Sequence, residues 1–298
     1  MTWSLASSPS QQGRIAIVTG ANIGLGYDTA LALAGKGCGV VLACRNLDKA
    51  NAAKAQILAQ HPKSHVECLK LDLSSLKSIR SFAKAFAKQH ETLDLLINNA
   101  GIMMPPYAVS EDGFESQMAA NYFGHFALTG LLLSLLTKTQ GSRIVSLSSL
   151  AHRWGTNTFD DINSKSSYSK RLAYGNSKLA CLMFAYQLNR RLRAAGSKTI
   201  AVAAHPGVAA TNLAQHFPKV MSVFFPLVGQ SSAAGALPTL YAALGEDVEG
   251  GDFCGPSGWR QMRGTPEKVR SSRASRDDAA VKKLWEMSEQ LTKVRFVF

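Results

Sequence analysis

Metal-ligand and disulfide patterns are absent from this chain. The five cysteines are odd in number and form no CxxC pair, so they indicate reduced thiols of an intracellular protein rather than a disulfide framework. The seven histidines show no metal-ligand spacing. His61 and His65 are four residues apart, but Pro62 lies between them and opposes a shared helix face. We therefore predict no metal site.

Long hydrophobic runs are also scarce. The most apolar windows, 126–136 and 220–228, fall short of the roughly 18 residues that a membrane-spanning helix needs. Residues 1–10 carry neither the basic region nor the apolar core of a signal peptide. We therefore expect a soluble, cytoplasmic protein with no integral membrane segment.

Acidic residues are few relative to basic ones, and the formal net charge is +13. Such a balance suits a nucleic acid, an anionic membrane surface or an anionic cofactor. The basic residues gather at 190–193 and between 260 and 283, without interleaved aromatic residues and without a zinc-finger or RNP motif. This pattern predicts solvated surfaces and no nucleic-acid partner. A weak contact with a membrane surface or with another subunit is the alternative.

Apolar, β-branched runs alternate with helical segments along the whole chain. Strands are predicted at 14–19, 40–44, 66–71, 93–98, 142–147 and 199–205, with a smaller one near 252–254, and helices at 25–36, 48–60, 74–90, 111–137 and 171–194. Asp48 is the candidate N-cap of the second helix. The alternation predicts a single α/β domain, doubly wound (Rossmann), over residues 1–298 with a mostly seven-stranded parallel sheet flanked by helices. Residues 1–12 are expected to be a flexible N-terminus and 256–298 a C-terminal extension.

A glycine-rich turn lies between the first predicted strand and the first predicted helix. Gly20, Gly24 and Gly26 follow the spacing GxxxGxG. Glycines permit a tight turn and a close backbone approach to a pyrophosphate, which then sits at the positive end of a helix. A plain strand–helix connection is the alternative, but the position after the first strand of a βαβ series favours a dinucleotide site.

In NAD-binding proteins, an acidic residue at the end of the second strand binds the adenine ribose. This sequence has no acidic residue there. Arg45 stands there instead, with Lys49 four residues on. A guanidinium at this place suits a 2′-phosphate, which favours NADP(H) over NAD(H). The alternative is that Arg45 is an ordinary solvent-exposed arginine.

After the glycine loop, four further motifs follow in this order: Asp72-Leu73, Asn98-Asn99-Ala100-Gly101, Tyr174-x-x-x-Lys178 and Pro206-Gly207. Together with the glycine loop they resemble the short-chain dehydrogenase/reductase family from residue 13 to near residue 255. The resemblance implies a catalytic set of Asn121, Ser149, Tyr174 and Lys178. The family pattern places the serine two residues before a small residue, here Ala151, and so selects Ser149 over Ser148. The implied cofactor-binding residues are Gly20, Asn22, Ile23, Gly24, Leu25, Gly26, Arg45, Asp72, Leu73, Asn99, Ala100, Gly101, Tyr174, Lys178, Pro206, Gly207, Val208 and Thr211.

Within that family, the phrases RIVSLSSLAH at 143–152 and YGNSKLA at 174–180 are similar to the retinol dehydrogenase branch. Membrane-bound members of the branch carry an N-terminal anchor, which this sequence lacks, so we interpret the chain as a soluble relative of bacterial type. Family members commonly pair through the two long helices, which implies a homodimer or homotetramer.

The chemistry agrees with these residue types. A tyrosine has a reference pKa near 10 and needs a neighbouring cation to act as an acid/base near neutral pH. Tyr174 and Lys178 are four apart in a predicted helix and so share one face. Ser149 would bind the substrate oxygen, and Asn121 would hold a water that links Lys178 to solvent. Taken alone, the Tyr–Lys spacing also suits a plain amphipathic helix.

The substrate side is predicted to be apolar. Residues 206–235 are rich in large apolar side chains and are interpreted as a substrate lid, with core packing or an interface helix as the alternative. We therefore expect an NADP(H)-dependent oxidoreductase of apolar aldehydes, ketones or the corresponding alcohols. Two alternatives stand beside it: a non-catalytic NADP(H)-binding sensor or scaffold, and a reductase of a carbon–carbon double bond.

Overall fold

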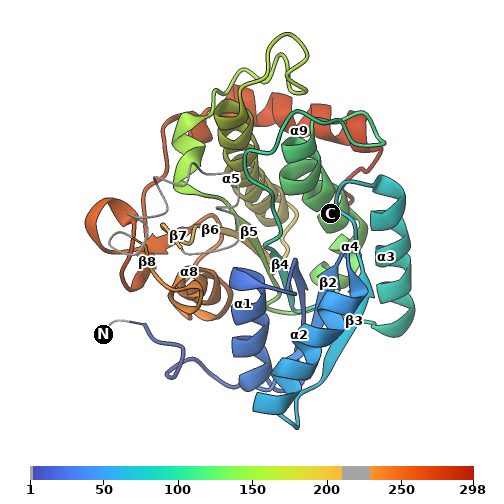
Figure 1. Cartoon of the computed structure of the whole chain (residues 1–298), viewed down its shortest axis with the longest axis vertical. Helices are drawn as coiled ribbons and strands as arrows, with labels where there is room; N and C mark the ends of the chain where they lie inside the picture. The colour runs from blue at the N-terminus through green and yellow to red at the C-terminus, as the bar shows by residue number, and fades with distance from the viewer. Residues whose placement is uncertain (1–2, 210–228) are drawn as a thin grey trace.

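The fold is taken from a computed structural model of the chain, which describes residues 3–209 and 229–298 (Figure 1). The strands are β1 (Ile15–Thr19), β2 (Gly39–Cys44), β3 (Val66–Lys70), β4 (Leu95–Asn98), β5 (Arg143–Leu147), β6 (Ile200–Ala204), β7 (Phe253–Pro256) and β8 (Pro266–Lys268). The α-helices are α1 (Gly24–Gly35), α2 (Leu47–Gln60), α3 (Leu76–Gln89), α4 (Gly124–Lys138), α5 (Lys170–Ala194), α8 (Ser232–Leu244) and α9 (Asp278–Thr292). The shorter helices are the π-helix η1 (Met118–Phe123) and the 3-10 helices η2 (Leu150–Trp154), η4 (Trp259–Gln261) and η5 (Ala274–Arg276).

One sheet runs through the molecule in the order β3-β2-β1-β4-β5-β6-β7-β8. Strands β1 to β7 are parallel, and β8 pairs antiparallel with β7. The predicted doubly wound α/β domain is confirmed, but the sheet has eight strands rather than seven. The added strand is three residues long and mostly exposed, so it has no apolar pattern by which it could be recognised. The chain order reverses between β1 and β4, where ligands bind in doubly wound folds.

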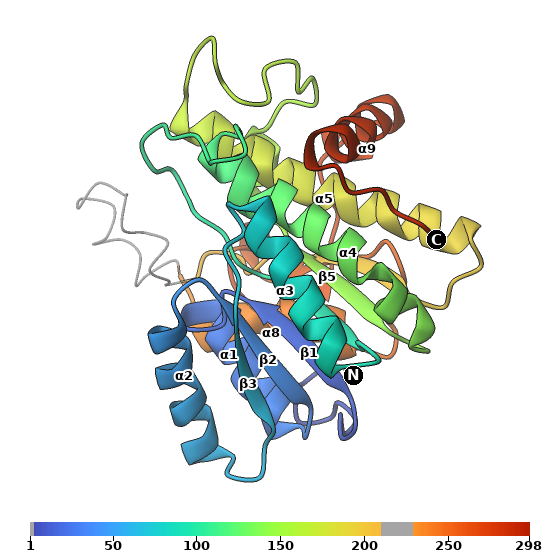
Figure 2. The same cartoon turned by 90° about the vertical axis from the view of Figure 1, so that its right-hand side faces the viewer.

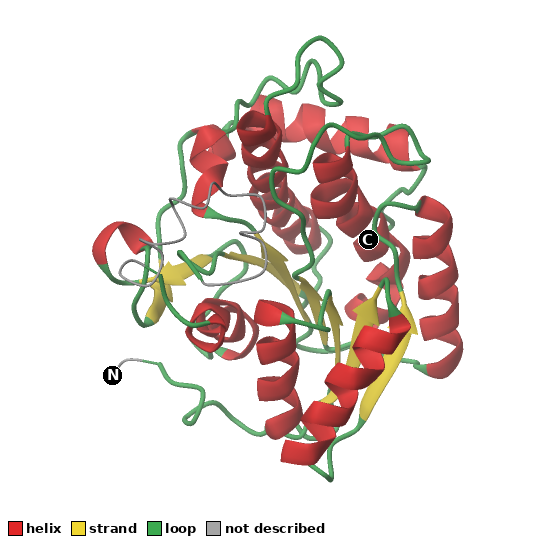
Figure 3. Ribbon diagram, in the orientation of Figure 1, coloured by secondary structure: helices red, strands yellow, loops and turns green. Residues whose placement is uncertain are grey.

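Helices cover both faces of the sheet. Helices α1, α2 and α8 lie on one face, and α3, α4 and α5 lie on the other, with α9 outside them (Figure 2; Figure 3). The sheet separates two hydrophobic cores, one on each face. Along β1, Ile17 packs into one core, and Ala16 and Val18 pack into the other. Each strand is therefore buried on both sides, which is why the strands are almost continuously apolar.

Two helices begin at other residues than predicted. Asn46, not Asp48, caps α2, and its side chain accepts a hydrogen bond from the Lys49 backbone N–H. The helix predicted at 111–137 begins only after Glu115, whose carboxylate accepts hydrogen bonds from the backbone N–H groups of Gln117 and Met118 at 3.0 and 2.9 Å. Residues 111–113 form a turn, because a buried carboxylate at 115 supplies the helix start.

The continuous helix Met118–Lys138, formed by η1 and α4, has 21 residues and a mean hydropathy of 1.3 over its most apolar window. Its length and composition alone would suffice to cross a membrane, and it exceeds the apolar windows found in the sequence. However, 78% of that window is buried inside the protein, as in a core helix.

Helix α9 and the chain end cover part of the outward face of α4 and α5. The fully buried Trp285 packs against Phe126 of α4 and Phe184 of α5, with ring centroids 5.2 and 5.9 Å apart. Phe296 joins the same cluster, and a Cβ at Gly130 would lie 2.6 Å from Val294. The face through which we expected subunits to pair is therefore occupied in part by the chain itself.

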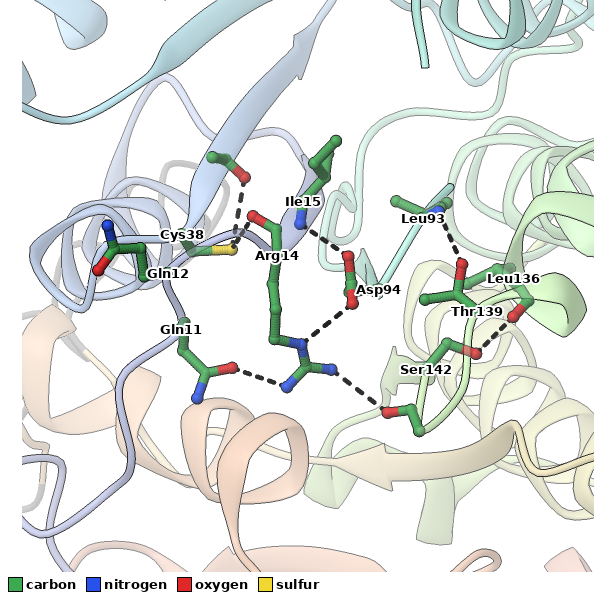
Figure 4. Close-up of polar contacts among 12 residues, drawn as sticks. Gln11, Gln12, Arg14, Ile15, Cys38, Leu93, Asp94, Leu136, Thr139 and Ser142 are labelled. Atoms are coloured by element: carbon green, nitrogen blue, oxygen red, sulfur yellow. Dashed lines mark hydrogen bonds and ion pairs between the residues drawn. The ribbon is translucent and has the colours of Figure 1, made fainter. Parts of the chain in front are cut away.

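The N-terminal edge of the sheet is joined to the segment that precedes β1 (Figure 4). The Arg14 guanidinium donates hydrogen bonds to the Gln11 side chain at 2.7 Å and to Asp94, which precedes β4, at 3.2 Å. Asp94 also accepts from the Ile15 N–H at 2.9 Å. The Lys36 ammonium donates to the carbonyls of Ala6 and Ser8. Residues 3–12, expected to be flexible, thus contact the domain at several points.

Candidate active site

The glycine loop joins β1 to α1 in close contact with the segment that follows β4. Gly20 and Gly24 have positive φ angles of 66° and 60°, which side chains disfavour. A Cβ at Gly26 would lie only 2.5 Å from both the Asn99 amide nitrogen and the Gly20 carbonyl oxygen. The N-cap residue Ile23 makes no side-chain cap, so the first N–H groups of α1 remain available to a ligand. This uncapped helix start behind a glycine cradle fits a pyrophosphate.

The predicted adenosine contacts lie at the same edge of the sheet. Arg45 directly follows β2 and is exposed, as is Lys49 in the first turn of α2. Asp72 and Leu73 follow β3, and the Asp72 carboxylate accepts a hydrogen bond from the Ser74 N–H at 2.9 Å. Since parallel strands end at one edge, the structure gathers these residues on the side where the glycine loop lies.

A buried threonine and a buried histidine hold the loop after β4. The Thr19 hydroxyl oxygen accepts hydrogen bonds from the N–H groups of Asn99 and Ala100, both at 2.9 Å. The Asn99 amide donates to the Thr19 carbonyl at 2.7 Å. His125 Nδ1 lies 2.9 Å from the Asn121 carbonyl and Nε2 lies 2.9 Å from the Thr19 hydroxyl. Because a carbonyl only accepts, Nδ1 carries the proton, and Nε2 accepts from Thr19.

Burial lowers the pKa of His125 to about 4, so the imidazole that connects Thr19 to Asn121 stays neutral. It joins the glycine loop to η1, in which Asn121 lies. Sequence reasoning missed both Thr19 and His125. Thr19 directly precedes Gly20 and could have been noticed there, whereas His125 lies within an apolar helix and gives no spacing signal.

Tyr174, Lys178 and Ser149 come together on the buried side of α5. Tyr174 and Lys178 are 4% and 5% exposed, and the lysine ammonium lies 6.0 Å from the tyrosine ring centroid. Burial raises the pKa of Tyr174 to about 12, and a hydrogen bond with the Ser149 side chain opposes that rise. We expected Lys178 to lower this pKa. Instead burial dominates, and the lysine, whose own pKa is lowered by burial, donates to the Leu147 carbonyl at 3.1 Å.

The geometry separates the two candidate serines. Ser148 is turned away, because its hydroxyl donates to the Lys178 carbonyl at 2.8 Å. Ser149 is the N-cap of η2, where its Oγ accepts from the Ala151 N–H at 3.2 Å and its hydroxyl lies beside Tyr174. Only Ser149 is placed to share a substrate oxygen with the tyrosine.

Asn121 lies in the π-helix η1, a helix type that is frequent at functional sites. We expected its side chain to hold a water, but both ends of its amide are bonded to the protein. Its oxygen accepts from the Ile102 N–H at 2.8 Å, and its nitrogen donates to the Ile102 carbonyl at 3.0 Å and to the Ser177 hydroxyl at 2.9 Å. The amide thereby holds the loop at Gly101, where a Cβ would lie 3.3 Å from the Lys178 ammonium.

The segment after β6 forms another wall of the site. Gly207 has a φ of 65°, and a Cβ there would lie 2.3 Å from the Met262 carbonyl oxygen. The Val208 N–H donates to the same carbonyl at 2.8 Å, while Pro206 accepts from the Gln230 side chain. Thr211 and most of the predicted lid lie in 210–228, outside the described residues. In the part of the chain that the structure describes, no three His, Cys, Asp or Glu side chains gather as a metal site.

Known proteins match this arrangement closely. The family model described as short chain dehydrogenase matches residues 14–221. Human retinol dehydrogenase 13 is 42% identical over 291 residues, which cover 94% of this chain and 84% of that protein. Mouse retinol dehydrogenase 11 is 44% identical over 241 residues, which cover 80% of this chain and 75% of that protein.

Solved structures agree with these relatives. An uncharacterized protein from Mycobacterium paratuberculosis superposes with a TM-score of 0.84 at 41% identity and covers 100% of both chains. A Shigella flexneri short chain dehydrogenase complexed with NADP has a TM-score of 0.67 at 22% identity, over 83% of this chain and 98% of that one, and shows the shared fold. Because the family match spans residues 14–221 and the retinol dehydrogenases align over most of its length, the chain belongs to the short chain dehydrogenase family.

Proposed function

We propose that the chain is an NADP(H)-dependent oxidoreductase that transfers a hydride between the nicotinamide and an apolar aldehyde or ketone, or the corresponding alcohol. The observation that carries this proposal is the meeting of Tyr174, Lys178 and Ser149 in one buried site beside the loop that follows β4. The membership of an oxidoreductase family supports it.

The proton chemistry follows from the state of these side chains. The bound nicotinamide supplies or accepts the hydride. With a pKa of about 12 in the cofactor-free chain, Tyr174 holds its proton at neutral pH and can donate it to a carbonyl oxygen. Ser149, beside it, can donate a second hydrogen bond to that oxygen, and this pair polarises the carbonyl and orients it. Lys178 places a positive charge 6.0 Å from the centre of the Tyr174 ring, on which negative charge develops.

Two observations support NADP(H). Arg45 stands exposed at the end of β2, where a 2′-phosphate would lie, with Lys49 on the next helix. A structural relative, the Shigella flexneri short chain dehydrogenase, is complexed with NADP. We therefore propose NADP(H) in preference to NAD(H).

The surroundings of Tyr174 support an apolar substrate. Ile102 and Trp154 are large apolar residues that remain 37% and 38% exposed. The Ile102 backbone is held by the Asn121 side chain, and Trp154 packs against Gly175, the residue after Tyr174, with the Arg171 guanidinium 4.5 Å from its ring centroid. The matched relatives are named for retinol, itself a long apolar alcohol. We propose that an extended apolar carbonyl or alcohol binds between these two residues.

A cofactor and substrate screen tests the function. We expect NADPH-dependent loss of nicotinamide absorbance with apolar aldehydes or ketones, and a loss of at least 100-fold in kcat for Tyr174→Phe. The matched control Tyr241→Phe removes a hydroxyl that bonds Asp247 in the other core, and should leave kcat unchanged. Full turnover by Tyr174→Phe would refute the assignment. NADPH binding without any turnover would instead support a sensor or scaffold, and a saturated product from an enone would support a carbon–carbon double-bond reductase.

A further inference from the structure

A histidine that the proposed mechanism does not use lies directly behind Ser149. His152 is the third residue of η2 and is fully buried. Its Nδ1 lies 2.6 Å from the Ser149 carbonyl oxygen, and its Nε2 lies 3.1 Å from the backbone nitrogen of Ser272. The two nitrogens therefore connect the end of β5 to a segment 120 residues later in the chain.

The partners define the tautomer of His152. A carbonyl oxygen can only accept, so Nδ1 carries the proton, and a backbone N–H can only donate, so Nε2 presents its lone pair. Burial lowers the pKa of His152, and the neighbouring Arg153 lowers it further, which keeps the ring neutral. The ring stands edge-on to Phe253 of β7, with centroids 5.6 Å apart, so that packing as well as hydrogen bonding holds it.

These bonds restrict Ser149. Its carbonyl oxygen accepts from the backbone N–H of His152 at 3.0 Å and from the imidazole, and its Oγ accepts from the Ala151 N–H. With its carbonyl held by the imidazole and its Oγ bonded to the Ala151 N–H, the Ser149 side chain stays where its hydroxyl bonds Tyr174. The orientation of Ser149 thus depends on His152, and that of His152 depends on Ser272.

The segment around Ser272, which His152 contacts, is held by further hydrogen bonds. The Ser275 hydroxyl donates to the Ser272 carbonyl at 2.7 Å, and its oxygen lies 2.9 Å from the Ser271 hydroxyl oxygen, which can donate to it. Arg276 donates to the Ser271 carbonyl at 2.9 Å. Residues 256–298, predicted only as a C-terminal extension, therefore include a rigid support for the site.

We propose that His152 is a positioning residue, which transmits the placement of the segment at Ser272 to the catalytic hydroxyl of Ser149. This inference rests on the proposed function, because it assigns Ser149 a role in turnover. It gives the C-terminal segment a part in catalysis although no residue of that segment touches the reacting groups.

Three variants separate the two hydrogen bonds of His152. His152→Asn keeps a donor near the Nδ1 position for the Ser149 carbonyl, His152→Gln keeps an acceptor near the Nε2 position for Ser272, and His152→Leu keeps neither. We expect His152→Leu to lower kcat for carbonyl reduction by about 10- to 100-fold, since a hydrogen bond to a charged or developing oxyanion is worth roughly that factor. Because transmission from Ser272 to Ser149 needs both bonds, His152→Asn and His152→Gln should each recover little of that loss, with the dissociation constant for NADPH unchanged in all three variants.

The pH profile distinguishes positioning from loss of stability. A Ser149 hydroxyl that no longer donates to Tyr174 stabilises the phenolate less, so the rise of alcohol oxidation with pH should move to higher pH in His152→Leu. Ser288→Ala, which removes buried hydrogen bonds to Tyr122 and to the Leu284 carbonyl on the opposite side of α5, is the matched destabilised control. It should leave kcat and the profile unchanged. Full recovery of kcat by either His152→Asn or His152→Gln, or losses that simply follow the melting temperatures of the variants, would overturn the proposal.

The tautomer can be measured without any substrate. In the ¹⁵N spectrum of the free chain at neutral pH, the His152 shifts should show a protonated Nδ1 and an unprotonated Nε2, and the opposite tautomer or an imidazolium would overturn the inference. An inactive wild-type chain would refute the proposed function and with it the catalytic part of this inference. An active wild type with unchanged His152 variants would refute this inference alone.

Discussion

Replacing Arg45 tests which nicotinamide cofactor the chain prefers. Within the described part of the chain, the Arg45 side chain is exposed and takes part in no hydrogen bond or ion pair, so its loss should change the free energy of unfolding by no more than about 0.5 kcal/mol. A charge-assisted bond between a guanidinium and a phosphate contributes about 1.5 to 3 kcal/mol. At about 1.4 kcal/mol per factor of ten, Arg45→Ala should raise the dissociation constant for NADPH about 10- to 150-fold.

The measurement is a titration of nicotinamide fluorescence with wild type, Arg45→Ala and Lys49→Ala. Affinity for NADH, which has no 2′-phosphate, should stay within twofold of wild type in Arg45→Ala. Lys49→Ala should show a smaller loss of NADPH affinity, because an ammonium cannot bond a phosphate in the two-pronged way of a guanidinium. Raising the salt concentration should weaken NADPH binding more in wild type than in Arg45→Ala. Equal loss of NADPH and NADH affinity, or loss of neither, would refute the assignment of Arg45.

Two further predictions concern pH and stability. Because burial raises the pKa of Tyr174 to about 12, the phenol stays protonated through neutral pH. The rate of carbonyl reduction should therefore be nearly constant from about pH 6 to 8 and fall in alkali, whereas the rate of alcohol oxidation should rise with pH. A reduction rate that already falls through pH 6.5 would point to a histidine as the acid. Trp285→Ala should lower the free energy of unfolding, measured by urea denaturation, by about 3 to 5 kcal/mol, because it leaves a cavity in the aromatic cluster between α4, α5 and α9. A loss below about 1 kcal/mol would show that α9 is not part of the core.

The parallel sheet could be predicted because its strands are buried on both faces and its helices are periodic. Strand β8 and the helices α8 and α9 were not predicted. Strand β8 is three residues long and mostly exposed, and α9 presents only a narrow apolar stripe whose partner, the face of α4 and α5, is distant in the chain. The start of the long helix was placed too early because Glu115 looks like an ordinary surface acid in the sequence, although it is buried and caps the helix.

The candidate site could be predicted where it consists of residue types whose chemistry can be recognised in the sequence. Tyr174, Lys178 and Ser149 meet as expected, but their protonation could not be read from spacing. A lysine one helical turn away suggests a lowered tyrosine pKa, whereas the structure shows that burial dominates and that the ammonium bonds the Leu147 carbonyl. Desolvation depends on everything packed around a group, and no local pattern encodes that quantity.

Two buried histidines help to hold the segments around the candidate site. His125 joins the Thr19 hydroxyl to the Asn121 carbonyl, and His152 joins the Ser149 carbonyl to the Ser272 N–H. In each case a neutral imidazole donates at one nitrogen and accepts at the other, so it bridges two segments that do not pair with each other in the sheet. A lysine would lack an acceptor in these places, and an apolar side chain would leave buried polar groups without partners. Imidazole therefore serves here as a structural bridge, and neither histidine is needed as the proton donor in the mechanism that we propose for Tyr174.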